Sequence, residues 1–142
     1  MLIARHRRWV GVAVLAILAA CSDGTGPEDP LEGGVMATFE VSGERFDVWV
    51  TNAKAIADIL ALEDGTSMAN IPNGALRAGP GPGDYNAPWS WHLDAQDIDM
   101  AEAAIEVCDG RPSLVDELLD DYLLVGRFCP WGATLVGVDD RR

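Results

Sequence analysis

The sequence predicts a single small α+β domain: a mostly antiparallel sheet of five or six short strands, two helices and one disulfide. Three observations support this fold class. Short stretches within residues 35–140 alternate apolar and polar side chains, as half-buried strands do. Two stretches repeat apolar residues at helical spacing, and two helices among that many strands favour α+β. Finally, Cys108 and Cys129 are available to pair with each other.

The domain begins with a predicted hairpin and helix. Residues 36–41 and 45–51 carry alternating β-branched and aromatic residues, and Gly43 between them can adopt the positive φ of a tight turn. A helix is predicted from residue 53 to about residue 62, with Asn52 as its N-cap. Its apolar stripe consists of Ile56, Ile59 and Leu60.

The middle of the domain is predicted to contain strands joined by turns. Residues 71–74 (Ile-Pro-Asn-Gly) indicate a turn that leads into a short strand over 75–78. Residues 79–84, in which Gly and Pro alternate, indicate a stiff surface loop. The next predicted strand covers 88–94. A further strand is predicted over 101–108, although its Ala and Glu content also allows a helix.

The domain ends with a second predicted helix and a last strand. The helix begins at Pro112 or Ser113, where Ser113 and Asp116 match a capping box, and it ends at Gly126. The last strand covers 133–138. The apolar face of the helix consists of Val115, Leu118, Leu119 and Tyr122.

The N-terminal residues predict export and a lipid anchor. Residues 1–8 are basic, and the apolar run that follows (9–20) has only 12 residues, whereas a bilayer span needs roughly 20. Residues 1–20 are therefore interpreted as a signal peptide. The sequence Leu18-Ala19-Ala20-Cys21 is similar to the lipobox of bacterial lipoproteins, which implies that Cys21 is diacylated and anchors the mature chain. The alternative is an ordinary signal peptide whose apolar region ends next to a cysteine.

A tether is predicted between the anchor and the domain. Residues 21–34 are polar and rich in Gly and Pro, so they cannot bury much apolar area. Ser22, rather than Asp, follows Cys21, which implies the outer membrane if the cell has two. The expected organisation is a signal peptide (1–20), a flexible tether (21–34) and one globular domain (35–140).

The charge of the chain limits the classes of partner. The net charge is −13 at pH 7, and cleavage after residue 20 removes three arginines and no acid, which leaves −16. Such a field repels nucleic acid and anionic lipid head groups. The expected partner is an extracellular protein or other ligand, with membrane contact through the lipid anchor alone; basic proteins and cations suit the charge best.

Cys108 and Cys129 are predicted to form a disulfide. With Cys21 consumed by the lipid, an even number of cysteines remains in an oxidising compartment. Two thiols alone do not make a structural zinc site, which normally has four Cys or His ligands. A bridge closing a loop of about 20 residues contributes roughly 3 kcal/mol in the chain-entropy model.

The strand at 88–94 contains His92, the one histidine after the signal peptide. Side chains alternate along a strand, so Trp89, Trp91 and Leu93 share one face, and Ser90, His92 and Asp94 share the other. The second face has the residue types of a hydrolase triad. However, same-face neighbours stand about 6.8 Å apart at Cα, whereas triad groups must reach each other by hydrogen bonds. A His92 bonded to the following loop or to nearby acids is favoured, and a small hydrolase using His92 is an alternative.

Acids are frequent between residues 94 and 109: Asp94, Asp97, Asp99, Glu102, Glu106 and Asp109. Counted from Asp97, a helix-loop-helix calcium loop needs Gly at position six and Glu at position twelve, where Glu102 and Cys108 stand. No metal or other cofactor is therefore predicted. Two alternatives are an irregular calcium site at Asp94, Asp97 and Asp99, and a paired-carboxylate glycosidase, for which no pair is singled out.

Tryptophan is frequent, and four of the five tryptophans lie in the domain, at positions 49, 89, 91 and 131. They are predicted to fill a small core; an exposed aromatic patch for a partner is the alternative. The predicted disulfide would bring Trp131 close to the Cys108-Asp109-Gly110 corner.

A dense motif extends from residue 89 to residue 131. It consists of Trp89-Ser90-Trp91-His92-Leu93-Asp94, Met100-Ala101-Glu102, Ile105-Glu106-Val107-Cys108-Asp109-Gly110, Pro112-Ser113 and Phe128-Cys129-Pro130-Trp131. This motif resembles a family of small secreted domains of bacteria and social amoebae, some of which carry a calmodulin-binding label. The resemblance covers about Phe39 to Val138 and implies no catalytic residue. Calmodulin targets are usually basic amphipathic helices, whereas residues 113–124 carry Asp116, Glu117, Asp120 and Asp121.

The sequence therefore predicts a lipid-anchored, non-enzymatic binding domain that works outside the cytoplasm and whose ligand is a protein. The candidate binding residues are Trp89, Trp91, His92, Asp94, Asp109 and Trp131. A protease-inhibitor-like module that uses the loop 79–84 is a second interpretation, and the hydrolase using His92 is a third.

Overall fold

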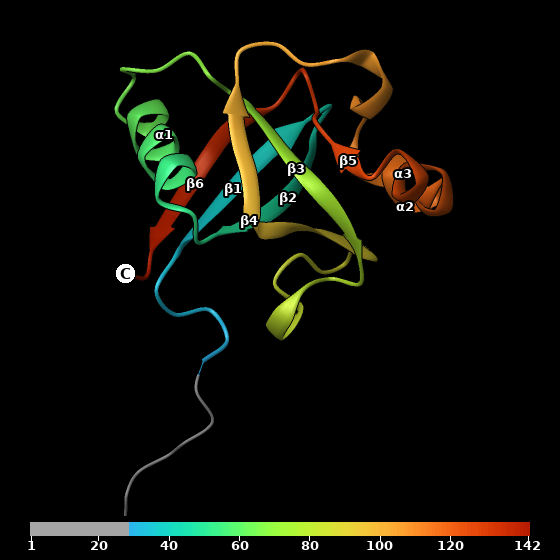
Figure 1. Cartoon of the computed structure of the whole chain (residues 1–142), viewed down its shortest axis with the longest axis horizontal. Coiled ribbons are helices and arrows are strands. Elements are labelled where there is room, and N and C mark those ends of the chain that lie inside the picture. The colour runs from blue at the N-terminus through green and yellow to red at the C-terminus, as the bar shows by residue number, and fades with distance from the viewer. Residues whose placement is uncertain (1–28) are drawn as a thin grey trace, which may run out of the picture.

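The computed structural model describes residues 29–142 (Figure 1). The predicted signal peptide, Cys21 and the tether up to residue 28 lie outside the described residues. No helix in the described part is long and apolar enough to cross a membrane. The elements are β1 (Val35–Val41), β2 (Glu44–Val50), α1 (Ala53–Glu63), β3 (Ile71–Ala78), η1 (Pro82–Asp84), β4 (Trp91–Ala101), η2 (Glu106–Cys108), α2 (Pro112–Glu117), α3 (Leu119–Val125), β5 (Arg127–Phe128) and β6 (Thr134–Asp140).

Two three-stranded antiparallel sheets carry the fold, in the orders β2-β1-β6 and β4-β3-β5. The α+β class, the six antiparallel strands and the disulfide are as the sequence predicts. The strands form two sheets rather than one, and in Figure 1 β3 and β4 run across β1, β2 and β6. Each sheet has an apolar inner face, so each covers the other and the core lies between them.

Aromatic rings from both sheets meet in the core. The ring centroids of Phe46 and Trp91 are 5.7 Å apart, those of Phe46 and Phe128 5.6 Å, and those of Trp91 and Phe128 5.1 Å. Phe39 stacks on Phe46 at 5.8 Å. Trp91 has no exposed surface. The predicted core role of the strand 88–94 is therefore correct for Trp91.

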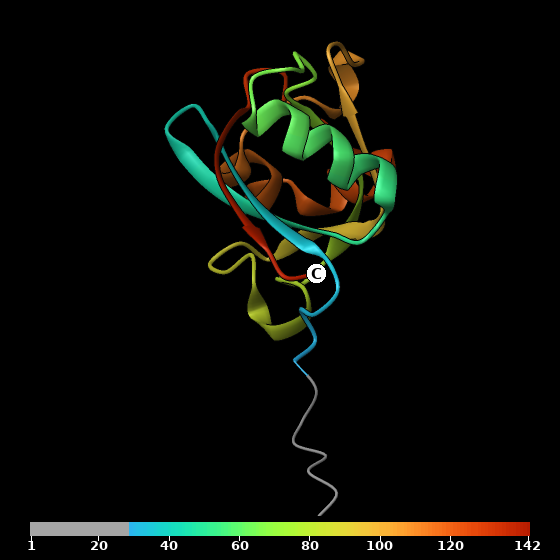
Figure 2. The ribbon, with the colours of Figure 1, turned by 90° about the vertical axis from the view of Figure 1, so that its left-hand side faces the viewer.

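Helix α1 begins and packs as its sequence indicates. The N–H of Ala55 donates to Asn52 Oδ1 at 2.8 Å, which confirms the predicted N-cap. The amide of Asn52 also donates to the carbonyl of Ile98 at 2.9 Å, which ties the helix start to β4. The helix contacts β4 and β6, one strand from each sheet, and covers the side of the core that faces the viewer in Figure 2.

The predicted turn at 71–74 is wrong, because these residues form the first half of β3 and pair with the second half of β4. Gly74 does not form a turn; the absence of a side chain there lets β3 lie close to side chains of β4. A Cβ atom there would lie 2.7 Å from Ile98 Cδ1 and 3.1 Å from Leu93 Cβ. Proline is tolerated in this strand at position 72, two residues before the pairing shifts register between Gly74 and Leu76.

The predicted strand boundaries around β4 also differ. The strand begins at Trp91 rather than at residue 88, because residues 86–90 form a turn in which the N–H of Trp89 donates to the carbonyl of Asn86. It then continues to Ala101. Residues 101–108 are neither the predicted strand nor an α-helix; after β4 they form a loop and the short 3₁₀ helix η2.

The second predicted helix is divided into α2 and α3 at Leu118, whose backbone dihedral angles (φ −118°, ψ 36°) are not helical. The start at Pro112 and the end at Gly126 agree with the prediction. Gly126 has φ 80°, the left-handed conformation that favours glycine at a helix end.

The predicted capping box is wrong, because both of its side chains have tertiary partners. The N–H and Oγ of Ser113 donate to the carboxylate of Glu44 in β2 at 2.8 and 2.7 Å. The carboxylate of Asp116 accepts from the N–H and Oγ of Ser90 at 2.7 and 2.6 Å. A carboxylate from the sheet thus caps α2, in the place of a side chain of the helix itself.

We expect Glu44→Gln to weaken this cap in a pH-dependent way. The backbone N–H of Ser113, its hydroxyl and Arg111 hold the pKa of Glu44 below its ordinary value of 4.5. A depressed folded-state pKa stabilises the fold above the unfolded-state value, and this stability is lost as the pH falls through the folded-state value. The variant should be about 1 kcal/mol less stable at pH 7, with a smaller difference at pH 3, measured by urea unfolding. Glu117→Gln at the exposed end of α2 is the matched control, and an unchanged difference at pH 3 would contradict the prediction.

Candidate functional site

His92 and Asp94 lie on the outer face of β4 and line an open cleft of about 480 Å³. The cleft lies between β4, the end of β3, the end of β2 and the connection from β3 to β4. We call it the His92 cleft. Its principal lining side chains are Trp49, Arg77, Pro82, Tyr85, His92 and Asp94.

The imidazole of His92 is held in one orientation. Nδ1 lies 2.7 Å from the carbonyl oxygen of Gly79, and because a carbonyl only accepts, Nδ1 carries the hydrogen and donates it. In the neutral ring Nε2 is then an acceptor, and it has no hydrogen-bond partner within residues 29–142. The sequence predicts the following loop or an acid as the partner of His92; the observed partner is the backbone of the preceding loop. The ring can therefore offer Nε2 to a ligand.

Tyr85 forms an aromatic wall beside His92. The two ring centroids are 6.0 Å apart in an edge-to-face arrangement, and Tyr85 Oη donates to the carbonyl of Leu93 at 3.2 Å. Burial raises the pKa of the Tyr85 hydroxyl well above its ordinary value of 10.0, so it stays protonated at neutral pH. Its role in the cleft is thus that of a rigid apolar surface rather than an acid or base.

An ion pair forms the rim of the His92 cleft. Arg77 donates to Asp94 at 2.9 Å, and both side chains are partly exposed. The N–H of Gln96, and then Arg77, hold the pKa of Asp94 below its ordinary value of 3.8. The rim therefore presents a positive and a negative group side by side, together with the aromatic rings.

Ser90, His92 and Asp94 do not form a triad. Ser90 bonds Asp116, and Asp94 pairs with Arg77. His92 bonds the backbone of Gly79. Each side chain is thus turned to a different partner, and no nucleophile–base hydrogen bond of the kind a Ser-His-Asp hydrolase needs joins them in the described chain.

The other predicted binding residues are not in the His92 cleft. Trp91 is fully buried in the core. Trp89 is half-buried and donates from Nε1 to the carbonyl of Arg45 at 2.8 Å. Trp131 and Asp109 meet at the disulfide corner, where the N–H of Trp131 donates to Asp109 Oδ1 at 2.8 Å. The predicted binding residues are therefore divided among the core, the cleft and this corner.

The disulfide between Cys108 and Cys129 is present, as predicted, with a Cα–Cα distance of 5.1 Å. It joins the end of η2 to the residue after β5. The N–H of Cys129 also donates to the carbonyl of Cys108 at 2.8 Å. Both cysteines are buried, so the bridge closes one end of the domain rather than facing a ligand.

The three candidate calcium ligands each pair with a different basic side chain. The pairs are Asp94–Arg77 at 2.9 Å, Asp97–Arg127 at 2.9 Å and Asp99–Lys54 at 2.6 Å. Within residues 29–142 no three His, Cys, Asp or Glu side chains are grouped as a metal ion would require. A calcium ion would have to displace these cations.

The loop 79–84 is folded on itself. Its residues include η1, and the N–H of Asp84 donates to the carbonyl of Gly81 at 3.0 Å. Gly81 (φ 87°) lies directly under Tyr85, where a Cβ would be 2.3 Å from Cε1 of that ring. The loop thus presents a compact turn that supports the wall of the His92 cleft.

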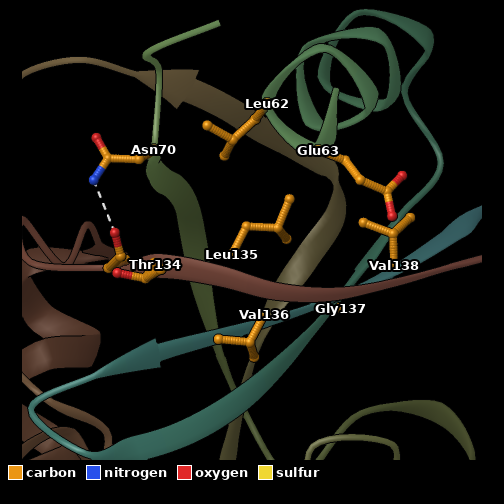
Figure 3. A pocket seen from close by; sticks show the side chains of 9 residues that line it. Leu62, Glu63, Asn70, Thr134, Leu135, Val136, Gly137 and Val138 are labelled. Atoms are coloured by element: carbon orange, nitrogen blue, oxygen red, sulfur yellow. Dashed lines mark hydrogen bonds between the residues drawn. The ribbon is translucent and has the colours of Figure 1, made fainter. Parts of the chain in front are cut away.

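Sequence reasoning missed a second hollow, of about 400 Å³, between the last turn of α1 and β6 (Figure 3). We call it the β6 groove. It is lined by Leu62 and Glu63 of α1, by Asn70 and by residues 133–138. The one signal in the sequence is the uncharged run Thr-Leu-Val-Gly-Val in a terminal strand, which by itself only indicates a strand. Trp49, Arg77 and Tyr85 of the His92 cleft were missed too, because they come from three separate segments.

These observations define a small disulfide-linked α+β domain of two packed antiparallel sheets, with open hollows on its surface. The sequence model described as the BP-74 N-terminal domain matches residues 34–141. The chain therefore belongs to the BP-74 N-terminal domain family. No match was found among curated proteins or among solved structures.

Proposed function

We propose that this protein is a non-enzymatic binding domain, lipid-anchored outside the cytoplasm, that recognises a protein ligand through the His92 cleft. The observation that carries the proposal is the lining of that cleft. It combines aromatic surface, an oriented imidazole whose Nε2 has no hydrogen-bond partner among the described residues, and an Arg–Asp pair at the rim. Each of these groups can bind a ligand, and within residues 29–142 none of them is hydrogen-bonded to a nucleophilic side chain.

The composition of the cleft favours a protein ligand. Tyrosine and arginine are among the residue types that contribute most to protein interfaces. Tyr85 and Arg77 line this cleft, and Trp49 borders it but is itself buried. The cleft is open, so it suits a side chain that projects from a larger partner. A small molecule is usually enclosed over most of its surface.

The proposal does not extend to calmodulin. Helices α2 and α3 have six and seven residues, and α3 carries Asp120 and Asp121 in its first turn. Calmodulin binds longer amphipathic helices, usually basic ones. The partner proposed here enters a cleft instead.

Affinity capture with matched variants tests the proposal. The full chain, tagged after Arg142, is exposed to envelope and secreted fractions with and without calcium, and retained proteins are identified by mass spectrometry. We expect a partner whose affinity falls about tenfold, or ~1.4 kcal/mol, in His92→Ala and in Arg77→Ala. Trp131→Ala, at the disulfide corner, is the control that should retain the partner. A partner lost only with Trp131→Ala, or no partner under either condition, would contradict the proposal.

We expect Cys21→Ser to release the protein from the membrane. Two or three acyl chains hold a soluble domain stably at a bilayer, whereas no helix of residues 29–142 is long and apolar enough to cross one. Cell fractionation followed by immunoblotting should find the wild-type protein in the membrane pellet and the variant in the soluble exported fraction. Ser22→Ala, next to the anchor, is the control, and an unchanged distribution of Cys21→Ser would exclude lipidation at this residue.

A further inference from the structure

The β6 groove follows the free edge of a sheet. In the order β2-β1-β6, β6 is the last strand, and within the described chain no strand pairs with its other side. The groove touches every residue from 133 to 138. Consecutive residues of a strand point to opposite faces, so a hollow that touches all of them runs along the edge. An edge strand presents unpaired N–H and C=O groups there.

The edge is protected at its beginning and open further along. The side-chain amide of Asn70 donates to the carbonyl of Ala133 at 2.8 Å, which occupies the position where another strand would start (Figure 3). From Thr134 to Val138 the strand has no charge and no proline, two of the devices that block an edge. A third such device, a β-bulge, is present at Val136, which the shift of the β1–β6 register leaves unpaired. Val136 is 43% exposed.

The wall opposite β6 is both apolar and negative. Leu62 and Leu135 face each other across the groove in Figure 3, and the carboxylate of Glu63 extends over Val138. Helix α1 has no basic residue in its last turn, and Asp64 follows Glu63 as C-cap. The negative end of the helix dipole therefore adds to these carboxylates. No salt bridge of residues 29–142 involves Glu63.

We infer that the β6 groove binds an extended peptide segment of another protein by β-strand addition, and that this segment carries apolar and basic residues on the same face, two positions apart. Its backbone bonds the free edge of β6, an apolar side chain lies between Leu62 and Leu135, and a Lys or Arg pairs with Glu63. Charge excludes a second copy of this chain as the favoured occupant, because each copy carries a net charge of −13 and the groove wall is itself acidic. This site is independent of the His92 cleft.

The test uses the full chain in detergent and a synthetic six-residue peptide, Val-Thr-Lys-Thr-Val-Thr, which places Val and Lys on one face (the Lys-Val peptide). Binding is followed by nitrogen-15 NMR, in which the amide signals of residues 134–138 should shift. A second peptide with every other amide N-methylated keeps the charge and loses the strand hydrogen bonds. It should bind at least about tenfold more weakly, because two or more bonds of ~1 kcal/mol each are lost.

Protein variants test the charge and the location. Glu63→Gln should weaken the Lys-Val peptide about two- to fivefold, the effect of one exposed ion pair, and exchange of Lys for Glu in the peptide should abolish binding. Glu102→Gln, an exposed acid on the loop after β4, and His92→Ala should leave the affinity unchanged. Because His92→Ala alters only the cleft, this result stands whether or not the proposed function is correct.

Four outcomes would overturn the inference. Equal affinity of the N-methylated peptide would mean attraction by charge alone. Signal shifts confined to the His92 cleft would mean that the peptide binds there and not at β6. No binding at millimolar peptide would mean that β6 does not accept an added strand. A cross-linked dimer whose β6 signals match those of the peptide complex would make a second copy the occupant.

Discussion

Trp91→Ala is expected to lower the free energy of unfolding by about 3–5 kcal/mol, the range for removing a large buried aromatic side chain. Trp91 has no exposed surface, and its ring packs against Phe46 and Phe128, so the cavity cannot be filled from solvent. Its Nε1 also donates to the carbonyl of Pro112 at 3.3 Å, at the start of α2. Small domains are stable by only about 5–15 kcal/mol in total. The variant should therefore populate the unfolded state at physiological temperature.

Urea unfolding followed by far-ultraviolet circular dichroism measures this loss without depending on tryptophan fluorescence. Trp131→Ala is the matched control, because the same residue type is 41% exposed at the disulfide corner, and a loss below about 1 kcal/mol is expected for such a surface site. If Trp91→Ala does not fold, Trp91→Phe keeps a ring in the core and should show an intermediate loss. Similar losses for Trp91→Ala and Trp131→Ala would show that Trp91 is not the central core residue.

Replacing both Cys108 and Cys129 by alanine is expected to cost about 3 kcal/mol. The bridge joins residues 21 positions apart, and the chain-entropy model assigns about that value to a loop of this length. The segment it closes contains α2 and α3, whose separate helices of six and seven residues are too short to be stable alone. For a domain of this size the loss corresponds to a fall in Tm of roughly 10–20 °C.

Differential scanning calorimetry of the wild type, the double alanine variant and the reduced wild type tests this effect. The reduced wild type and the variant should both melt lower, since each lacks the covalent link. The variant should not respond to reductant, which serves as the internal control. A Tm of the wild type that is unchanged by full reduction would contradict a stabilising role for the bridge.

Local sequence signals were sufficient for several elements. The hairpin of β1 and β2 follows from alternation around Gly43, whose φ is 79°. The start of α1 follows from Asn52, and the end of α3 from Gly126. In each case the residues that interact lie within a few positions of each other, so the local sequence pattern directly reflects the interaction that forms the turn or the helix end. The disulfide was predictable for a different reason, namely that the cysteine count left one pairing.

The candidate site was predictable only in part. His92 and Asp94 were identified from their strand, and both line the cleft. Trp91, from the same motif, is buried in the core, because alternation along β4 places it on the inner face. The residues that complete the cleft, Arg77 and Tyr85, come from β3 and from the connection to β4. No spacing in the sequence links them.

The sequence by itself determined the α+β class, the hairpin, the helix ends and the cysteine pairing, all of which depend on short-range patterns or counting. The tertiary structure decided which strands share a sheet, that Glu44 rather than a residue of α2 caps that helix, and that Ser90, His92 and Asp94 turn to separate partners. It also decided that the edge of β6 stays open beside α1. Hydrogen bonds and packing between residues dozens of positions apart select these arrangements, and local alternatives of similar energy, such as the Ser113 capping box, are displaced by them.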